Sequence, residues 1–295
     1  MDFKKLQSAM LAWLKRRLKN DSFRQFESVY NSIRKGAEDW KIFSSFSAVP
    51  GYTGKNRLNP GENEKSEARN LRRGWLPDRW QADQLGRTLL VLGMAENNLK
   101  NFGDRLEKLF VSSDLGEAVA LYQSLPVLPQ PLDLQARAAE GLRHNITTVF
   151  NAVALDNPYP ADYLEDDAWN QMILKALFVD SPLYRIQGLE KRANPDLAHM
   201  LVEYAHERWS AGRTVSPELW RPVGPFIDDA TVGDIERVLA GPGEIQKQAA
   251  ALALLDAGSA GAKELLNKYR NILDTVTKGN ITWDDIGRQV NKQLV

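Results

Sequence analysis

Apolar residues recur at spacings of three and four along nearly the whole chain, without any series of alternating, β-branched runs. This period is that of an amphipathic helix, so the sequence predicts an all-α protein of about a dozen helices. In residues 21–36, for example, Asp21 is placed to cap a helix, an apolar stripe follows, and Gly36 is placed to end it. Further helices are expected near residues 79–95, 98–111, 114–125, 133–154, 165–179 and 195–210, with three or four more between 231 and 293.

Residues 47–70 differ from this pattern, because they hold prolines, glycines and polar residues but no apolar stripe. They are expected to form a long loop that serves as a lid, a surface loop or a linker. The expected organisation is an N-terminal helical hairpin at 1–46, the loop at 47–70 and a main helical array at 71–295, together one continuous domain.

From about Asp162 onward, the expected helices are joined by short turns marked by proline or glycine. Paired-helix arrays of the HEAT type have this organisation, although no fixed repeat length is present here. The predicted architecture is therefore an irregular α-helical array, a HEAT-like α-α superhelix.

The composition excludes several classes of function. Thirty-eight basic residues balance thirty-eight acidic ones, so no overall field attracts nucleic acid, and no nucleic-acid partner is expected. The absence of cysteine removes disulfides, thiolate metal sites and cysteine nucleophiles. Neither a secretory signal nor an apolar run of about 20 residues is present, so a cytoplasmic location is expected.

The helix expected at residues 3–19 is basic and amphipathic. Its apolar face carries Trp13 and several leucines, and five cations lie away from that face. Two interpretations stay open: the helix gives peripheral contact with an anionic inner-membrane surface, or its apolar face packs against its own protein, which is the commoner arrangement.

Glu203 and His206 have the Glu-x-x-His spacing of di-iron bundles, which is one pattern that can form a metal site. His199, and Glu140 with His144, would be the further ligands. All of these residues lie opposite the apolar stripes of their helices, so they are expected to face solvent, and neither a metal nor another cofactor is predicted. No phosphate-binding glycine motif or nucleophile elbow nominates a catalytic residue.

Two polar side chains, in contrast, fall within apolar helix faces. Arg208 lies on the face of Leu197 and Leu201, and Asn170 lies in a helix that is apolar nearly all round. Buried polar groups are costly unless they are hydrogen-bonded, so each needs a ligand or an internal partner. The sequence predicts a pocket for an anionic or aromatic small molecule, and the alternative is an internal polar network. The candidate ligand-binding residues are Asn170, Tyr184, Arg185, Tyr204, Arg208 and Trp220.

Long ungapped stretches of the chain resemble the EboA family. These stretches are NPDLAHMLVEYAHERW at 194–209, SAGRTVSPELWRPVGPF at 210–226, RAAEGLRHN at 137–145, NPYP at 157–160 and WNQMILKALF at 169–178. The resemblance covers at least residues 70–227, and more loosely the rest.

The resemblance implies a bacterial secondary-metabolism protein encoded in ebo-type gene clusters. The neighbouring genes encode a prenyltransferase-like membrane protein, a TatD-like hydrolase and a sugar-phosphate-cyclase-like protein. It implies traffic of a metabolite or its precursor towards the periplasm, with other ebo-cluster proteins as partners, and it supplies no catalytic residues. The predicted function is non-catalytic metabolite binding or a scaffold role; the alternative is an enzyme acting on a small aromatic or prenylated metabolite.

Overall fold

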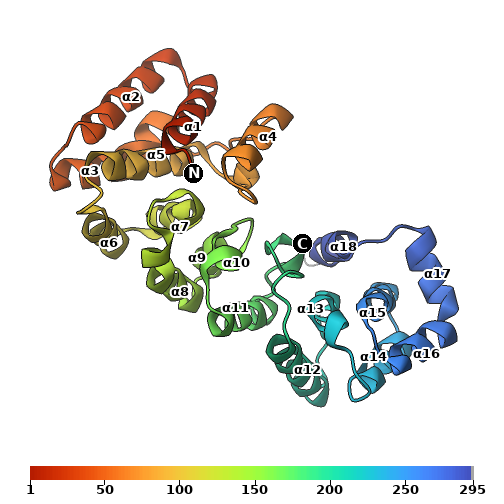
Figure 1. The fold of residues 1–295 in the computed structure, drawn as a ribbon. Helices are drawn as coiled ribbons and strands as arrows, with labels where there is room; N and C mark the ends of the chain where they lie inside the picture. Colours follow the sequence, from red (N-terminus) through yellow and green to blue (C-terminus); the bar gives the residue numbers. More distant parts are fainter. Residues whose placement is uncertain (294–295) are drawn as a thin grey trace. The chain divides into compact units, whose positions relative to one another are not determined.

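The computed structural model describes residues 1–293, and within this range the chain is all-α as predicted. The described residues form eighteen α-helices and six short 3-10 helices, with connecting turns and loops and no β-strand (Figure 1). The number exceeds the expected dozen because short breaks divide several of the expected helices. The chain forms two compact units, Met1–Leu164 and Glu165–Val295. The predicted HEAT-like superhelix and the predicted domain boundaries stay predictions.

Unit 1 is built around α5 (Ala82–Asn97), which is buried along nearly its whole length. Helices α1, α2, α3 and α7 all pack against it (Figure 1). The other elements of unit 1 and their bounds are α1 (Phe3–Arg17), α2 (Asn20–Arg34), α3 (Asp39–Thr53), α4 (Glu62–Leu71), η1 (Pro77–Arg79), α6 (Phe102–Ser112), α7 (Leu115–Ser124), η2 (Leu125–Val127), η3 (Pro131–Leu134), α8 (Gln135–Arg143), α9 (Thr147–Ala154) and α10 (Tyr159–Tyr163).

Two glycines of α5 allow α2 and α3 to approach closely. A Cβ atom at Gly86 would lie 2.8 Å from Val49 of α3 and 3.2 Å from Phe26 of α2. One at Gly93 would lie 3.1 Å from the ring of Tyr30. The absence of these two side chains therefore sets the spacing between α5 and its neighbours.

A buried ionic group connects α5 to α3 and α7. Arg87 donates from Nη1 to Asp83 Oδ2 at 2.6 Å and from Nε to the carbonyl of Phe46 at 3.3 Å. Glu117 of α7 lies 4.0 Å from the same guanidinium. All three charged residues are buried. Removing one partner would leave a buried charge uncompensated, so this group constrains how the three helices pack.

The apolar face of α1 is covered by unit 1. Leu6, Met10 and Leu14 are fully buried, and Trp13 donates from Nε1 to Glu67 of α4 at 2.8 Å. Insertion of this face into a membrane, one of the two interpretations left open for residues 3–19, is incompatible with this packing, because the face is already occupied. Of the two sequence interpretations, the structure shows the packed one.

The long loop expected at residues 47–70 is also wrong. Helix α3 continues through Pro50 to Thr53, and α4 occupies Glu62–Leu71. Helix α4 has no apolar stripe because ion pairs hold it to α1: Glu64 accepts from Arg16 at 2.7 Å and from Arg17 at 2.5 Å. Hydrogen bonds from these arginines lower the pKa of Glu64 to about 2.

The single helix expected at 133–154 is instead two helices, α8 and α9, separated by residues 144–146. His144 has extended backbone, and its Nδ1 atom accepts from the amide of Ile146 at 3.1 Å. This local hydrogen bond competes with the helical one. As a result Ile146, expected in the apolar stripe, is exposed.

Unit 2 contains the remaining elements. They are α11 (Asp166–Phe178), η4 (Leu183–Arg185), α12 (Pro195–Ser210), η5 (Pro217–Leu219), α13 (Trp220–Val223), η6 (Gly224–Phe226), α14 (Val232–Ala240), α15 (Glu244–Asp256), α16 (Ala260–Lys268), α17 (Arg270–Lys278) and α18 (Trp283–Gln293). Helix α15 packs against α13, α14, α17 and α18 (Figure 1). Among residues 1–293, no helix has both the length and the apolar character needed to span a bilayer.

We expect Gly86→Ala to lower the free energy of unfolding by about 1–3 kcal/mol, because the added methyl group overpacks the contact with Val49. Urea denaturation monitored by circular dichroism measures the change. Gly51→Ala in α3 is the control, since a Cβ there meets nothing within 4 Å. Equal stability of the two variants would contradict the close approach.

Candidate functional site

Asn170 is buried as predicted, and its partner is internal. Its Nδ2 atom donates to Asn194 Oδ1 at 3.2 Å, and Asn194 Nδ2 donates back to Asn170 Oδ1 at 2.9 Å. Asn194 also caps α12 by accepting from the amide of Leu197 at 2.9 Å. The amide pair thus joins α11 to the start of α12, and Asn170 does not line the cavity described below.

Several arginine and aromatic residues of unit 2 contact other residues of the protein. Trp220 is fully buried and stacks on Trp209 with ring centroids 6.0 Å apart. Arg192 lies over the ring of Trp169, and Arg221 donates from Nε to Glu190 at 2.6 Å. Tyr184 and Arg185 lie in η4 and are half-buried. Trp220, Tyr184 and Arg185 are not among the residues that line the cavity.

The histidines are exposed, as the sequence predicts, although His144 lies in the break between α8 and α9. His144, His199 and His206 are exposed, as are Glu140 and Glu203. His206 contacts Asp234 of α14 at 2.9 Å. No group of three or more His, Cys, Asp or Glu residues in the described range is arranged to hold a metal ion.

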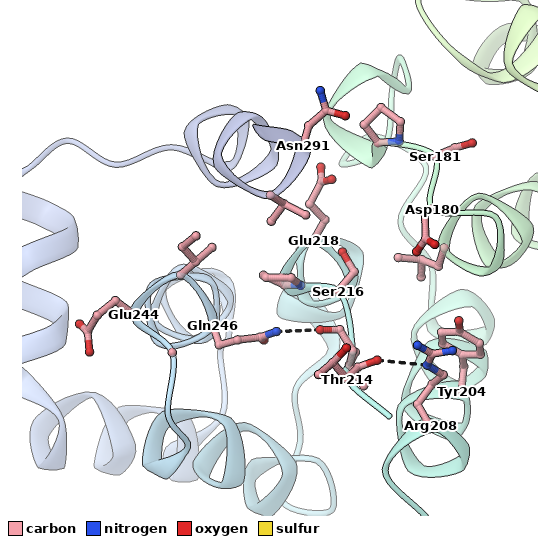
Figure 2. Close-up of a pocket in the computed structure, with 17 residues that line it drawn as sticks. Asp180, Ser181, Tyr204, Arg208, Thr214, Ser216, Glu218, Glu244, Gln246 and Asn291 are labelled. Carbon is pink, nitrogen blue, oxygen red and sulfur yellow. Dashed lines mark hydrogen bonds between the residues drawn. The ribbon is translucent and has the colours of Figure 1, made fainter. Parts of the chain in front are cut away.

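Unit 2 contains a cavity of about 500 Å³, within the range of small-molecule sites. It lies between α12, the segment leading into η5, the start of α15 and the end of α18 (Figure 2). Its lining combines apolar and polar side chains. The lining residues are Leu177, Asp180, Ser181, Pro182, Tyr204, Arg208, Thr214, Val215, Ser216, Pro217, Glu218, Gly243, Glu244, Ile245, Gln246, Val290 and Asn291.

Arg208 and Tyr204 are the two sequence-predicted residues that the structure brings to this cavity. Arg208 donates from Nε to the carbonyl of Thr214 at 3.1 Å, and its guanidinium lies 6.0 Å from the centre of the Tyr204 ring. No carboxylate of the described residues pairs with Arg208, and no hydrogen bond occupies its two terminal nitrogens. The guanidinium is therefore oriented by the protein but not neutralised by it (Figure 2).

Glu218, which sequence reasoning missed, is the most buried charged residue of the lining, with 2% of its surface exposed. Its carboxylate accepts from the amides of Leu183 at 3.2 Å and Tyr184 at 2.5 Å. Burial raises the pKa of Glu218 to about 7, although these amides and the more distant Arg221 act in the opposite direction.

Close packing of α18 encloses Glu218. A Cβ atom at Gly287 would lie 2.5 Å from the Tyr184 ring and 2.7 Å from Glu218 Oε1. Only a glycine at this position lets α18 lie directly against η4 and η5. Gln246 of α15 completes the wall of the cavity by donating to the carbonyl of Val215 at 2.7 Å (Figure 2).

Glu218 could not be identified as a site residue from a local sequence pattern. It follows Pro217 at the start of a helical segment, where an acidic residue normally faces solvent and interacts with the helix dipole. The residues that bury it belong to η4 and α18, which are distant in sequence. The one available indication was the apolar run of Leu219 and Trp220 that follows it directly.

We expect Asn170→Ala to lower the free energy of unfolding by about 1–3 kcal/mol, because Asn194 would lose its buried partner. Differential scanning calorimetry measures the loss. Gln171→Ala, at an exposed position of the same helix, is the control and should leave the melting temperature nearly unchanged. A stable Asn170→Ala variant would show that the amide pair carries no packing role.

Glu218 should make stability depend on pH. Its pKa is about 7 in the folded state against 4.5 unfolded, so between these values the folded state binds more protons. Stability therefore falls as pH rises through this window, by about 3 kcal/mol in total. Urea titrations of the wild type and Glu218→Gln measure the free energy of unfolding of each protein. As pH rises between these values, the free energy of unfolding of the wild type should fall relative to that of the variant. A constant difference between the two proteins would contradict the raised pKa.

A family model described as metabolite traffic protein EboA matches residues 6–224, well over half of the chain. No curated protein and no solved structure matches this chain. The match includes α12, Arg208 and Glu218, whereas the walls of the cavity from α15 and α18 lie beyond it. The resemblance read from the sequence is confirmed, and the chain belongs to the EboA family of metabolite traffic proteins.

Proposed function

We propose that this protein is a non-catalytic metabolite-binding component of an ebo-type traffic pathway, and that its ligand binds in the cavity of unit 2. The observation that carries the proposal is Arg208, whose guanidinium lines the cavity and has no carboxylate partner among the described residues. An unpaired, oriented guanidinium is suited to a carboxylate or phosphate group.

The surroundings of Arg208 support an aromatic or planar ligand body. Tyr204 lies beside the guanidinium, and Leu177, Val215 and Ile245 supply apolar lining. Such a cavity binds the body of a ligand by apolar contact and fixes its orientation by a few polar groups. The ligand class that we propose is therefore a small anionic or aromatic metabolite.

The family description supports a role in traffic. We propose that the bound metabolite or its precursor is delivered towards the periplasm, and that the protein works in the cytoplasm beside other ebo-cluster proteins. Because the apolar face of α1 is occupied, any membrane proximity would come from those partners or from the exposed cations of α1.

A second candidate function is catalysis. Glu218 favours it, since a cavity-lining carboxyl group with a pKa of about 7 suits a general acid or base. Incubating the protein with its retained metabolite distinguishes the two functions. Conversion that Glu218→Gln abolishes would favour an enzyme, and unchanged release of the metabolite would favour a carrier.

Arg208→Met tests the proposed function. The side chain keeps its bulk and loses only one hydrogen bond, so the melting temperature should stay close to that of the wild type. We expect the metabolite retained by protein purified from the native host, measured by mass spectrometry, to fall about tenfold or more, because a charged hydrogen bond is lost.

Arg213→Met is the matched control, since Arg213 is exposed, lies near Arg208 in sequence and does not line the cavity. It should retain the metabolite as the wild type does. Equal retention by a well-folded Arg208→Met variant would remove the cavity from the proposal.

A further inference from the structure

We infer that the cavity of unit 2 binds a zwitterionic small molecule, with its anionic group at Arg208 and an ammonium group at Glu218. This inference rests on the proposed function and narrows its ligand class. Nothing in the family description implies a positively charged group on the ligand.

The first observation is that the carboxylate of Glu218 lacks a cation. It accepts one amide hydrogen bond on each oxygen, whereas an ionised carboxylate can accept about four in all. No Lys, Arg or His of the described residues lies within ion-pair distance of it. Arg221, the cation that acts on it from a distance, donates to Glu190 instead.

The second observation is the charge balance of the lining. Asp180, Glu218 and Glu244 contribute carboxylates, and Arg208 is the single cationic residue among the lining residues. A ligand with only negative groups would be repelled by these carboxylates, because little solvent screens the charges around Glu218. A positive group on the ligand would balance part of this negative charge.

The third observation is the separation of the two polar ends. In Figure 2, Arg208 and Tyr204 lie at one end of the drawn residues, whereas the carboxylate of Glu218 points towards Asn291 at the other. Arg208 lies on α12 and Glu218 in η5, so the two charged groups reach the cavity from different elements. The ligand that we infer therefore carries its opposite charges on two separate groups.

Burial of Glu218 is consistent with this arrangement. Its pKa is raised because the charged form is poorly solvated and because Asp284 of α18 opposes ionisation. A ligand ammonium group would supply the missing stabilisation of the charged form and would be recognised for that reason.

The test uses three probes of similar shape: para-aminomethylbenzoate, para-methylbenzoate and para-methylbenzylamine. They carry both charges, only the negative charge and only the positive charge. Isothermal titration calorimetry with the full-length wild type should show the zwitterion binding about tenfold or more tighter than either analogue, since each analogue leaves one charged contact unmade.

Two variants assign the contacts. Glu218→Gln should remove the preference for para-aminomethylbenzoate over para-methylbenzoate, and Arg208→Met should remove its preference over para-methylbenzylamine. Glu207→Gln is the control, because Glu207 is exposed and does not line the cavity. The wild-type ranking decides the inference even where a variant fails to fold.

Each contrary result has a separate meaning. If para-methylbenzoate binds as tightly as the zwitterion, the ammonium contact is wrong and the proposed anion site stands. If none of the three probes binds at millimolar concentration, the inference is overturned, and retention of the native metabolite by Arg208→Met still decides the proposed function. If para-methylbenzylamine binds as tightly as the zwitterion, Arg208 makes no contact with the ligand. That result would overturn both the inferred zwitterion site and the proposed function that rests on Arg208.

Discussion

The burial of Glu218 is the constraint on which the architecture around the cavity depends. A carboxylate with 2% exposure must be hydrogen-bonded, and the amides that serve it come from η4. This fixes η4 against η5, and Gly287 then allows α18 to cover both. These contacts hold three short or terminal segments around one polar group on one side of the cavity, whose other walls come from α12 and the start of α15.

Unit 1 also contains buried charged side chains, but there the protein itself supplies their partners. Its buried charges, centred on Arg87, have protein partners on α5 itself and on α3, and Glu117 of α7 lies nearby. Their role is complete without a ligand, because the guanidinium is paired and covered. Glu218 and Arg208 each lack a partner of opposite charge among the described residues, and this difference separates a structural ionic group from a candidate binding site.

The sequence predicted best those elements that carry their own local signals. Helix α12 begins and ends as expected at residues 195 and 210, since Asn194 caps it and an apolar stripe runs along it. Helix α4 was missed because it buries only Ala68 and is held by ion pairs with α1, which no local pattern reveals. The break at residues 144–146 was missed because a single side-chain hydrogen bond causes it. The spacing of apolar residues shows which face of a single helix is buried. It does not show the ion pairs between α1 and α4 or the hydrogen bond between His144 and Ile146.

The same limit explains what was predicted of the site. A polar residue within an apolar face indicates that a partner exists but not whether the partner is protein or ligand. For Asn170 the partner is Asn194, a residue of the protein, whereas Arg208 reaches the cavity with its terminal nitrogens unoccupied. Glu218 gave no such indication, because the elements that bury it lie elsewhere in the chain. A binding site assembled from distant segments therefore becomes recognisable only when the partners of each buried charge are known, and here those partners single out one cavity in unit 2.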